Sequence, residues 1–182
     1  MFQVNLDRIA VEKKEVEMKR IISLVIILNM LGVSSVIAQK YNDSQEKLEQ
    51  VKEFGKKFVH YNGLFYDMGQ KLTEAGMAME GKYWNDLSEV SGSVYDACYH
   101  IRDLWDILNL IKPDVAESKL DYIYSSIKEK ADYVVSLKTS TSDYLEKQLT
   151  LMEDQFGSDV IKQAEEFRDV YLEWIAYLET LL

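Results

Sequence analysis

One proline in 182 residues, together with apolar residues that recur at steps of three and four, restricts the fold of this chain more than any other feature. A repeat of three and four places apolar side chains along one face of an α-helix. No stretch alternates apolar and polar residues for long enough to predict a β-strand. The sequence therefore predicts an all-α domain in which each helix buries one apolar face.

The apolar seams predict four helices that fold as an antiparallel up-down four-helix bundle with coiled-coil packing. The predicted ranges are 43–80 with Gly81 as the left-handed cap residue, 85–111, 113–156, and a last helix after Gly157. The first seam consists of Val51, Phe54, Phe58, Tyr61, Phe65, Met68, Leu72, Ala75 and Met79. The last seam consists of Val160, Ala164, Phe167, Tyr171, Trp174, Leu178 and Leu181.

The third predicted helix is too long for the other three. Unbroken from Asp114 to Phe156, it would measure about 64 Å and overshoot its partners by about four turns. Hydroxyl side chains compete with the backbone for hydrogen bonds, so we predict a kink or break, and hence a fifth segment, at a run of four of them. These are Thr139, Ser140, Thr141 and Ser142. The alternative is a continuous helix that projects with the start of the last helix as a two-helix tip.

Residues 18–39 have the three-part layout of a secretory signal. Lys19 and Arg20 form a positive n-region, and a mostly apolar run follows them. Val36 and Ala38 then occupy the −3 and −1 positions of a peptidase site. An uncleaved membrane anchor is the alternative, but it would need about 20 predominantly apolar residues, and polar residues interrupt this run.

This signal sets the predicted domain organisation. We expect translation to begin at Met18 and cleavage to follow Ala38, so that residues 1–38 are an N-terminal extension plus signal peptide. A genuine cytosolic extension over residues 1–17 is the alternative. Residues 39–182 would form a single helical-bundle domain, located in the periplasm or secreted, with no membrane insertion after cleavage.

The predicted domain is strongly acidic. The chain has 21 Lys and Arg against 31 Asp and Glu. Five of the basic residues and four of the acidic residues lie within residues 1–38, so residues 39–182 carry a formal charge of −11. Such a surface repels phosphate backbones and anionic lipid, which argues against nucleic-acid binding. It would attract a basic protein partner, although acidity also serves simply to keep an exported domain soluble.

Few residues suggest catalysis or metal binding. Cys98 is the only cysteine, so no intramolecular disulfide can form, and its place on an apolar helix face predicts a buried thiol. The spacing of Asp96, His100 and Asp103 makes them candidate metal ligands, although acid-rich helices often produce it by chance. Haem ligation by a histidine and a methionine is a further alternative. We expect no enzyme activity, no cofactor and no metal.

Two further patterns bear on function. Small residues recur every seven positions at Gly55, Asn62, Gly69 and Gly76, which predicts either a close helix approach or a ligand against bare backbone. Several tyrosines lie beside the seams and are candidates for an interaction surface. They are Tyr95, Tyr99, Tyr122, Tyr124 and Tyr133.

These patterns together favour an exported binding protein over an enzyme. We expect it to bind another protein through its acidic, tyrosine-bearing faces, and the charge of these faces favours a basic partner. Its role would be that of an inhibitor, an immunity-type protein or an envelope component. Two alternatives stand beside this expectation. One is a bundle that holds a small apolar ligand, haem or metal in its interior, and the other is a structural spacer without a partner.

Overall fold

The computed structural model describes residues 43–110 and 117–182. Within these ranges every regular element is an α-helix, which confirms the predicted all-α class. The residues from Ser44 to Leu182 form one compact unit. The predicted signal, the cleavage site after Ala38 and the predicted helix boundary at Pro113 lie outside the described residues.

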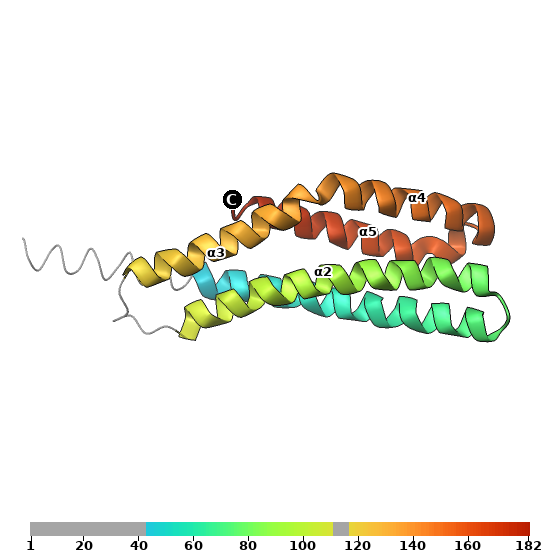
Figure 1. Ribbon diagram of the computed structural model, residues 1–182, viewed down its shortest axis with the longest axis horizontal. Coiled ribbons are helices and arrows are strands. Elements are labelled where there is room, and N and C mark those ends of the chain that lie inside the picture. The colour runs from blue at the N-terminus through green and yellow to red at the C-terminus, as the bar shows by residue number, and fades with distance from the viewer. Residues whose placement is uncertain (1–42, 111–116) are drawn as a thin grey trace, which may run out of the picture. The chain divides into compact units, whose positions relative to one another are not determined.

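Five helices in the described ranges form an antiparallel bundle of four columns (Figure 1). The first helix is followed by α2, which runs back beside it; α3 and α4 then continue one another as the third column, and α5 returns. The bounds are 43–74 for the first helix, Ala78–Leu110 (α2), Glu117–Ser136 (α3), Lys138–Phe156 (α4) and Ser158–Glu179 (α5). This is the predicted up-down bundle, with its third column broken into two segments.

The break in the third column falls at Leu137, two residues before the predicted hydroxyl run. The Leu137 amide donates to the Val134 carbonyl at 3.1 Å, a tighter turn than the α-helical pattern. Hydroxyl groups on both sides of it bond to backbone carbonyls, Ser136 Oγ to Tyr133 at 2.6 Å and Ser140 Oγ to Leu137 at 3.0 Å. These bonds agree with the predicted competition between hydroxyl side chains and the helix backbone.

The first helix ends earlier than predicted. Gly76 has φ +82, and the amides of Gly76 and Met77 donate to the carbonyls of Thr73 and Leu72, at 3.0 and 2.9 Å. This is a Schellman motif with glycine at the left-handed position. The predicted end at Gly81 is therefore wrong, because Gly81 lies inside α2.

Two positions of the first predicted seam are consequently exposed. Met79 is 69% exposed and Ala75 is also exposed, because Ala75 lies in the turn and Met79 lies in the first turn of α2. In the last helix the seam starts one residue later than predicted, since Val160 is 41% exposed and Ile161 is 2% exposed. The other predicted seam residues of these two helices are buried or packed against the core.

Gly69 and Gly81 allow the first helix and α2 to approach closely. A Cβ at Gly69 would overlap the Asn85 side chain and lie 3.0 Å from the Gly81 carbonyl oxygen. A Cβ at Gly81 would lie 2.7 Å from the Gly69 carbonyl oxygen. The packing interpretation of the glycine stripe therefore holds at Gly69, whereas Gly76 belongs to the connecting turn.

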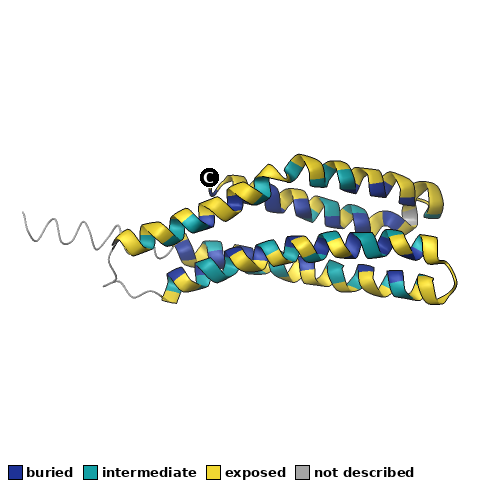
Figure 2. Ribbon diagram, viewed as in Figure 1, coloured by how far each residue is buried: buried dark blue, intermediate teal, exposed yellow. Residues whose placement is uncertain are grey.

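The core combines aliphatic side chains with a row of aromatic rings, and Figure 2 shows the buried positions on the helices. Phe58 and Phe65 of the first helix pack edge-on against Phe167 of α5, with centroids 6.3 and 5.5 Å apart. Trp174 continues the row beside Phe58, and Trp84 continues it beside Phe65. Each such pair contributes about 0.5–1.5 kcal/mol beyond the burial of its apolar area.

Three tryptophans are completely or almost completely buried: Trp84, Trp105 and Trp174. None of their indole N–H groups has a hydrogen-bond partner among the described residues. A buried donor without a partner costs about 1–3 kcal/mol, so the burial of the large rings must exceed that cost. None of the described helices combines the length and the apolar character that crossing a bilayer requires.

Candidate binding grooves on the two sides of α2

Two surface grooves lie along α2. One is lined from α2 by residues such as Asp86, Glu89 and Ser93, and the other by Tyr95, Cys98 and Arg102 among others. At 3.6 residues per turn these two sets project from opposite sides of the helix. The same helix therefore serves two separate grooves.

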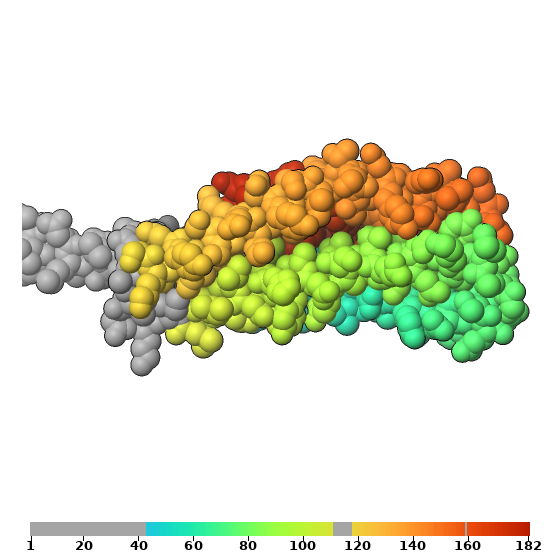
Figure 3. Space-filling view, viewed as in Figure 1, coloured from blue at the N-terminus to red at the C-terminus, as the bar shows by residue number. Residues whose placement is uncertain are grey.

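The first, here named the tyrosine groove, lies between α2 and the broken third column. Its volume is about 580 Å³, within the range of small-ligand sites. Figure 3 shows the surface hollowed between α2 and the α3–α4 column, where atoms of α5 are visible. The lining residues are Asp86, Glu89, Val90, Ser93, Val94, Ala97, Tyr133, Val134, Leu137, Ser140, Thr141, Tyr144 and Tyr171.

The charge of the tyrosine groove is negative. Asp86 and Glu89 line it, and no lysine or arginine is among its described lining residues. Lys82, outside the lining, pairs with Asp86 at 2.6 Å. Burial raises the pKa of the Tyr144 phenol, and the nearby Asp86 carboxylate raises this pKa further. The groove thus favours a positively charged occupant.

The break at Leu137 shapes the wall of this groove. Leu137 is 42% exposed and Tyr133, one turn earlier, is 64% exposed. On the opposite side Tyr171 of α5 is buried, and this burial raises the pKa of its phenol. Leu137 and Tyr133 thus form an exposed wall of the groove, and Tyr171 lines it from a buried position. Such a groove is suited to hold an aliphatic or aromatic side chain.

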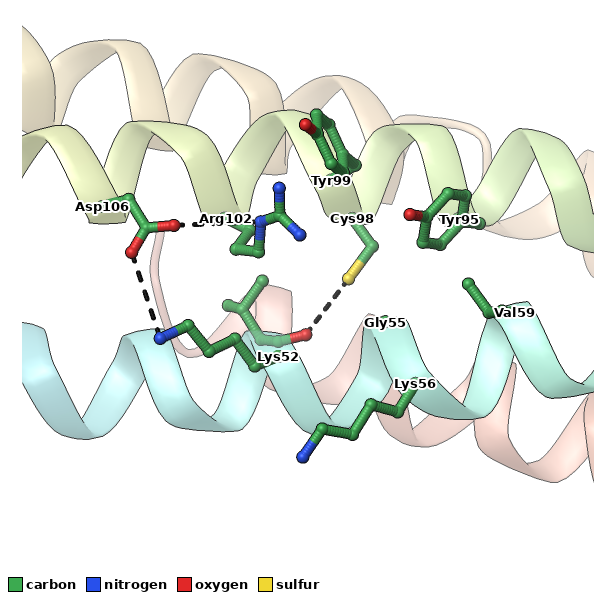
Figure 4. Close-up of a pocket in the computed structure, with 10 residues that line it drawn as sticks. Lys52, Gly55, Lys56, Val59, Tyr95, Cys98, Tyr99, Arg102 and Asp106 are labelled. Atoms are coloured by element: carbon green, nitrogen blue, oxygen red, sulfur yellow. Dashed lines mark hydrogen bonds and ion pairs between the residues drawn. The ribbon is translucent and has the colours of Figure 1, made fainter.

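The second, here named the Gly55 groove, lies between the first helix and α2 and has a volume of about 410 Å³. Figure 4 shows Cys98 pointing from α2 toward the first helix beside Gly55. A Cβ at Gly55 would meet only the Cys98 sulfur, at an ordinary 3.7 Å. The lining residues are Val51, Lys52, Gly55, Lys56, Val59, Tyr95, Cys98, Tyr99, Arg102 and Asp106.

One end of the Gly55 groove carries two cations around one carboxylate. Asp106 lies 4.0 Å from Lys52 Nζ and 3.9 Å from Arg102 Nε. The Arg102 guanidinium also bonds to Asp103 at 2.9 Å and lies over the Tyr99 ring, 3.9 Å from its centroid. Stacking on an aromatic face holds an arginine in place and adds a cation–π attraction.

Cys98 forms the floor of this groove and is 1% exposed. Its thiol donates to the Val51 carbonyl at 3.3 Å, and burial raises the pKa of the thiol to about 12. A thiol in this state is not a nucleophile near neutral pH. This placement agrees with the predicted buried position of Cys98.

The five predicted interaction tyrosines fall into different surroundings. Tyr95 and Tyr99 line the Gly55 groove, and Tyr133 lines the tyrosine groove. Tyr122 is 75% exposed and lines neither groove. Tyr124 packs edge-on against Trp105, with centroids 5.7 Å apart, and so covers the core. The structure thus brings three of the five into grooves, on two different sides of α2.

The metal candidates are not brought together. In the described part of the chain no three His, Cys, Asp or Glu side chains are grouped so that they could hold a metal ion. Asp96 and His100 are exposed, and Asp103 accepts hydrogen bonds from Arg102. The spacing of these three residues on one helix therefore does not produce a site in the structure.

Several groove residues were missed by the sequence reasoning, among them Glu89, Tyr144 and Arg102. A partial signal existed for Tyr144, because the groove residues Tyr133, Leu137 and Tyr144 share one helical face at steps of four and seven. For Glu89 and Arg102 the sequence offers no such signal, because acidic and basic residues are common on solvated helix faces. Comparisons with protein-family models, curated proteins and solved structures gave no match.

Proposed function

We propose that the protein is exported and acts as a non-enzymatic binding protein that holds a segment of a basic partner protein in the tyrosine groove. One observation carries this proposal: Asp86 and Glu89 line a groove with three tyrosines, and none of its described lining residues is a cation. Complementary charge speeds the association of protein partners and selects among them. The overall acidity of the chain acts in the same direction.

The wall of the groove suggests how the partner would be held. A lysine or arginine can pack its aliphatic stem on the Tyr133 ring and place its charge near Glu89. Leu137, 42% exposed, offers an apolar contact to a neighbouring side chain. Tyrosine and arginine pairs of this kind are frequent anchors of protein interfaces.

The biological role that fits this binding mode is an inhibitor, an immunity-type protein or an envelope interaction protein. The predicted signal at residues 18–39 supports a site of action in the periplasm or outside the cell. The alternative of an interior ligand beside the glycine stripe has less support. At Gly69, the third of the four stripe positions, the Asn85 side chain and the Gly81 carbonyl occupy the space that a ligand would need.

Site-specific crosslinking in the native envelope tests the proposal. A photoreactive residue at Tyr133 should crosslink to a basic protein, and the same residue at Tyr66, which is 55% exposed but outside both grooves, should not. Glu89→Gln and high salt should each weaken the crosslink, whereas Glu74→Gln, at an exposed position outside both grooves, should not. Equal crosslinking from both positions, or an acidic partner insensitive to Glu89→Gln, would refute the proposal.

A further inference from the structure

We infer, building on the proposed function, that the partner segment held in the tyrosine groove is an amphipathic α-helix of about three turns, basic toward one end. Such a helix would lie along α2 and the third column as an additional column of the bundle. Four features of the groove point to it: the spacing of its lining residues, its hydrogen bonding, its size and its charge.

Both walls of the groove carry lining residues at steps of four, three and four. On α2 these are Asp86, Val90, Ser93 and Ala97, and on the third column they are Tyr133, Leu137, Ser140 and Tyr144. Such steps keep side chains on one face of a helix, and helices in a bundle face their neighbours with this spacing. Tyr133 is 64% exposed and Leu137 is 42% exposed, so no helix of the described chain covers the two stripes.

The groove offers few hydrogen-bond partners to an extended backbone. Its walls are helices, whose backbone amides and carbonyls bond within each helix. The hydroxyls of Ser93 and Ser140 each donate to a backbone carbonyl three or four residues earlier, at 3.0 Å. The phenols of Tyr144 and Tyr171 are hydrogen-bonded to neighbouring side chains of the same chain. An extended segment would leave the backbone groups that face the groove unpaired, whereas a helix pairs its own backbone groups.

The size of the groove fits one face of such a helix. From Asp86 to Ala97 the α2 wall is about 16 Å long, the length of three helical turns. A helix of this length and about 10 Å in diameter occupies about 1,300 Å³. The groove has a volume of about 580 Å³, so roughly half of the helix would sink into it and the rest would face solvent. The small side chains of Ser93 and Ala97 let the helix approach the α2 backbone.

The charge of the groove determines the composition of one end of the helix. Asp86 and Glu89 lie at the N-terminal end of the α2 wall, and Val90 and Ala97 follow further along. Asp86 pairs with Lys82 at 2.6 Å, whereas Glu89 is exposed and has no ion-pair partner in the described chain. The helix should therefore carry a lysine or arginine near Glu89 and small apolar side chains one and two turns beyond it.

The spacing of crosslinks in the native envelope tests the helix. The photoreactive residue p-benzoylphenylalanine replaces Tyr133 in one full-length variant and Tyr144 in another, and mass spectrometry locates the labelled residues of the partner. The two positions are 11 residues apart along the third column, or about 16 Å. The labelled partner residues should be about 11 apart in a helix, but only about five apart in an extended segment.

The outcomes separate the helix from the proposed function. A spacing of about eight or more supports the helix, and a smaller spacing overturns it while the proposed function stands. If neither position crosslinks above the background of the Tyr66 variant, the proposed function is refuted and the helix with it.

A synthetic peptide of the labelled segment provides a second test. Proline at the residue midway between the two labelled ones should weaken binding about 100-fold, because a helix interior disfavours proline. In a helix this residue faces away from the groove, so alanine at the same place should change the affinity less than about twofold. A loss of less than about tenfold with proline would overturn the helix.

A matched pair of serine variants ties the peptide to the groove. Ser93→Lys and Ser125→Lys make the same change of charge at exposed positions, the first inside the groove and the second outside both grooves. Ser93→Lys should weaken the basic peptide at least about tenfold, because like charges repel at the interface, and Ser125→Lys should change its affinity less than about twofold. Equal affinities of the two folded variants would place the helix elsewhere and overturn the inference.

Discussion

Replacing Gly69 by alanine should destabilise the protein, although the same replacement at two other glycines of the first helix should stabilise it. A glycine-to-alanine change inside a helix gains about 1 kcal/mol of helix propensity at each position. At Gly63 a Cβ meets nothing within 4 Å, and at Gly55 it makes one ordinary contact, at 3.7 Å from the Cys98 sulfur. We therefore expect both of these variants to gain up to about 1 kcal/mol.

At Gly69 the new methyl group would overlap the Asn85 side chain and press on the Gly81 carbonyl at 3.0 Å. Asn85 can rotate away, but the carbonyl belongs to the backbone of α2, so the two helices must separate. Overpacking of this kind costs about 1–3 kcal/mol. A cost in the upper half of that range exceeds the gain of about 1 kcal/mol in helix propensity. We expect Gly69→Ala to be about 2 kcal/mol less stable than Gly63→Ala.

Urea unfolding at pH 7, followed by circular dichroism, measures these differences directly. Gly81→Ala should show a larger loss than Gly69→Ala, because its Cβ would lie 2.7 Å from the Gly69 carbonyl oxygen. The slope of the unfolding free energy against urea concentration should be the same in all variants, because they expose similar surface area on unfolding. If Gly69→Ala proves as stable as Gly63→Ala, the close approach of the two helices is refuted.

Two further predictions follow from burial. Because burial raises the pKa of Cys98 to about 12 from an ordinary 9.0, the unfolded chain loses the thiol proton first as pH rises. The Cys98 thiol should therefore lower stability by about 1.4 kcal/mol per pH unit between pH 9 and 12, and Cys98→Ala should make the slope shallower by that amount. Burial also raises the pKa of the Tyr177 phenol, so part of the slope should remain above pH 10; equal slopes in the two proteins would contradict the prediction. Ile161→Ala, at a 2% exposed position, should cost about 2–5 kcal/mol in urea unfolding. Val160→Ala, at 41% exposure, should stay within about 0.5 kcal/mol, and a reversed order would refute the register of α5.

The sequence was sufficient to predict the fold class and most of the core, because helical burial depends on a short repeat. Phe58, Phe65 and Phe167 all follow that repeat, and all are fully buried. The same repeat led to the wrong end for the first helix. Ala75 and Met79 continue the phase of the seam through the turn, and periodicity alone does not distinguish a turn from another helical turn.

The error was to place the end of the first helix at Gly81 and not at Gly76. Gly76 and Gly81 both fit a helix end by residue type, but only Gly76 has positive φ, while Gly81 is needed where two backbones approach. The stripe through Gly69 indicated a close approach on the side of the first helix, but the partner position, Gly81, has no such pattern around it in the sequence. The Schellman hydrogen bond from Met77 to Leu72 is likewise a product of the folded turn.

The grooves were harder to predict than the core. A groove between helices depends on how each helix is rotated about its axis, and on which side chains from distant parts of the chain meet there. Tyr133 and Glu89 are 44 residues apart and line the same groove, whereas Tyr95, near Glu89 in sequence, lines the groove on the other side of α2. Tyrosines beside a seam therefore indicate a boundary position but not a shared surface.

The three buried tryptophans give this protein a built-in optical reporter. Trp84, Trp105 and Trp174 lie at different points along the bundle, and none of their N–H groups bonds to a described residue. An indole that is shielded from water and bonds to no polar group emits at short wavelength, and it shifts to longer wavelength when water enters. Single-tryptophan variants would thus show by fluorescence which level of the bundle opens first.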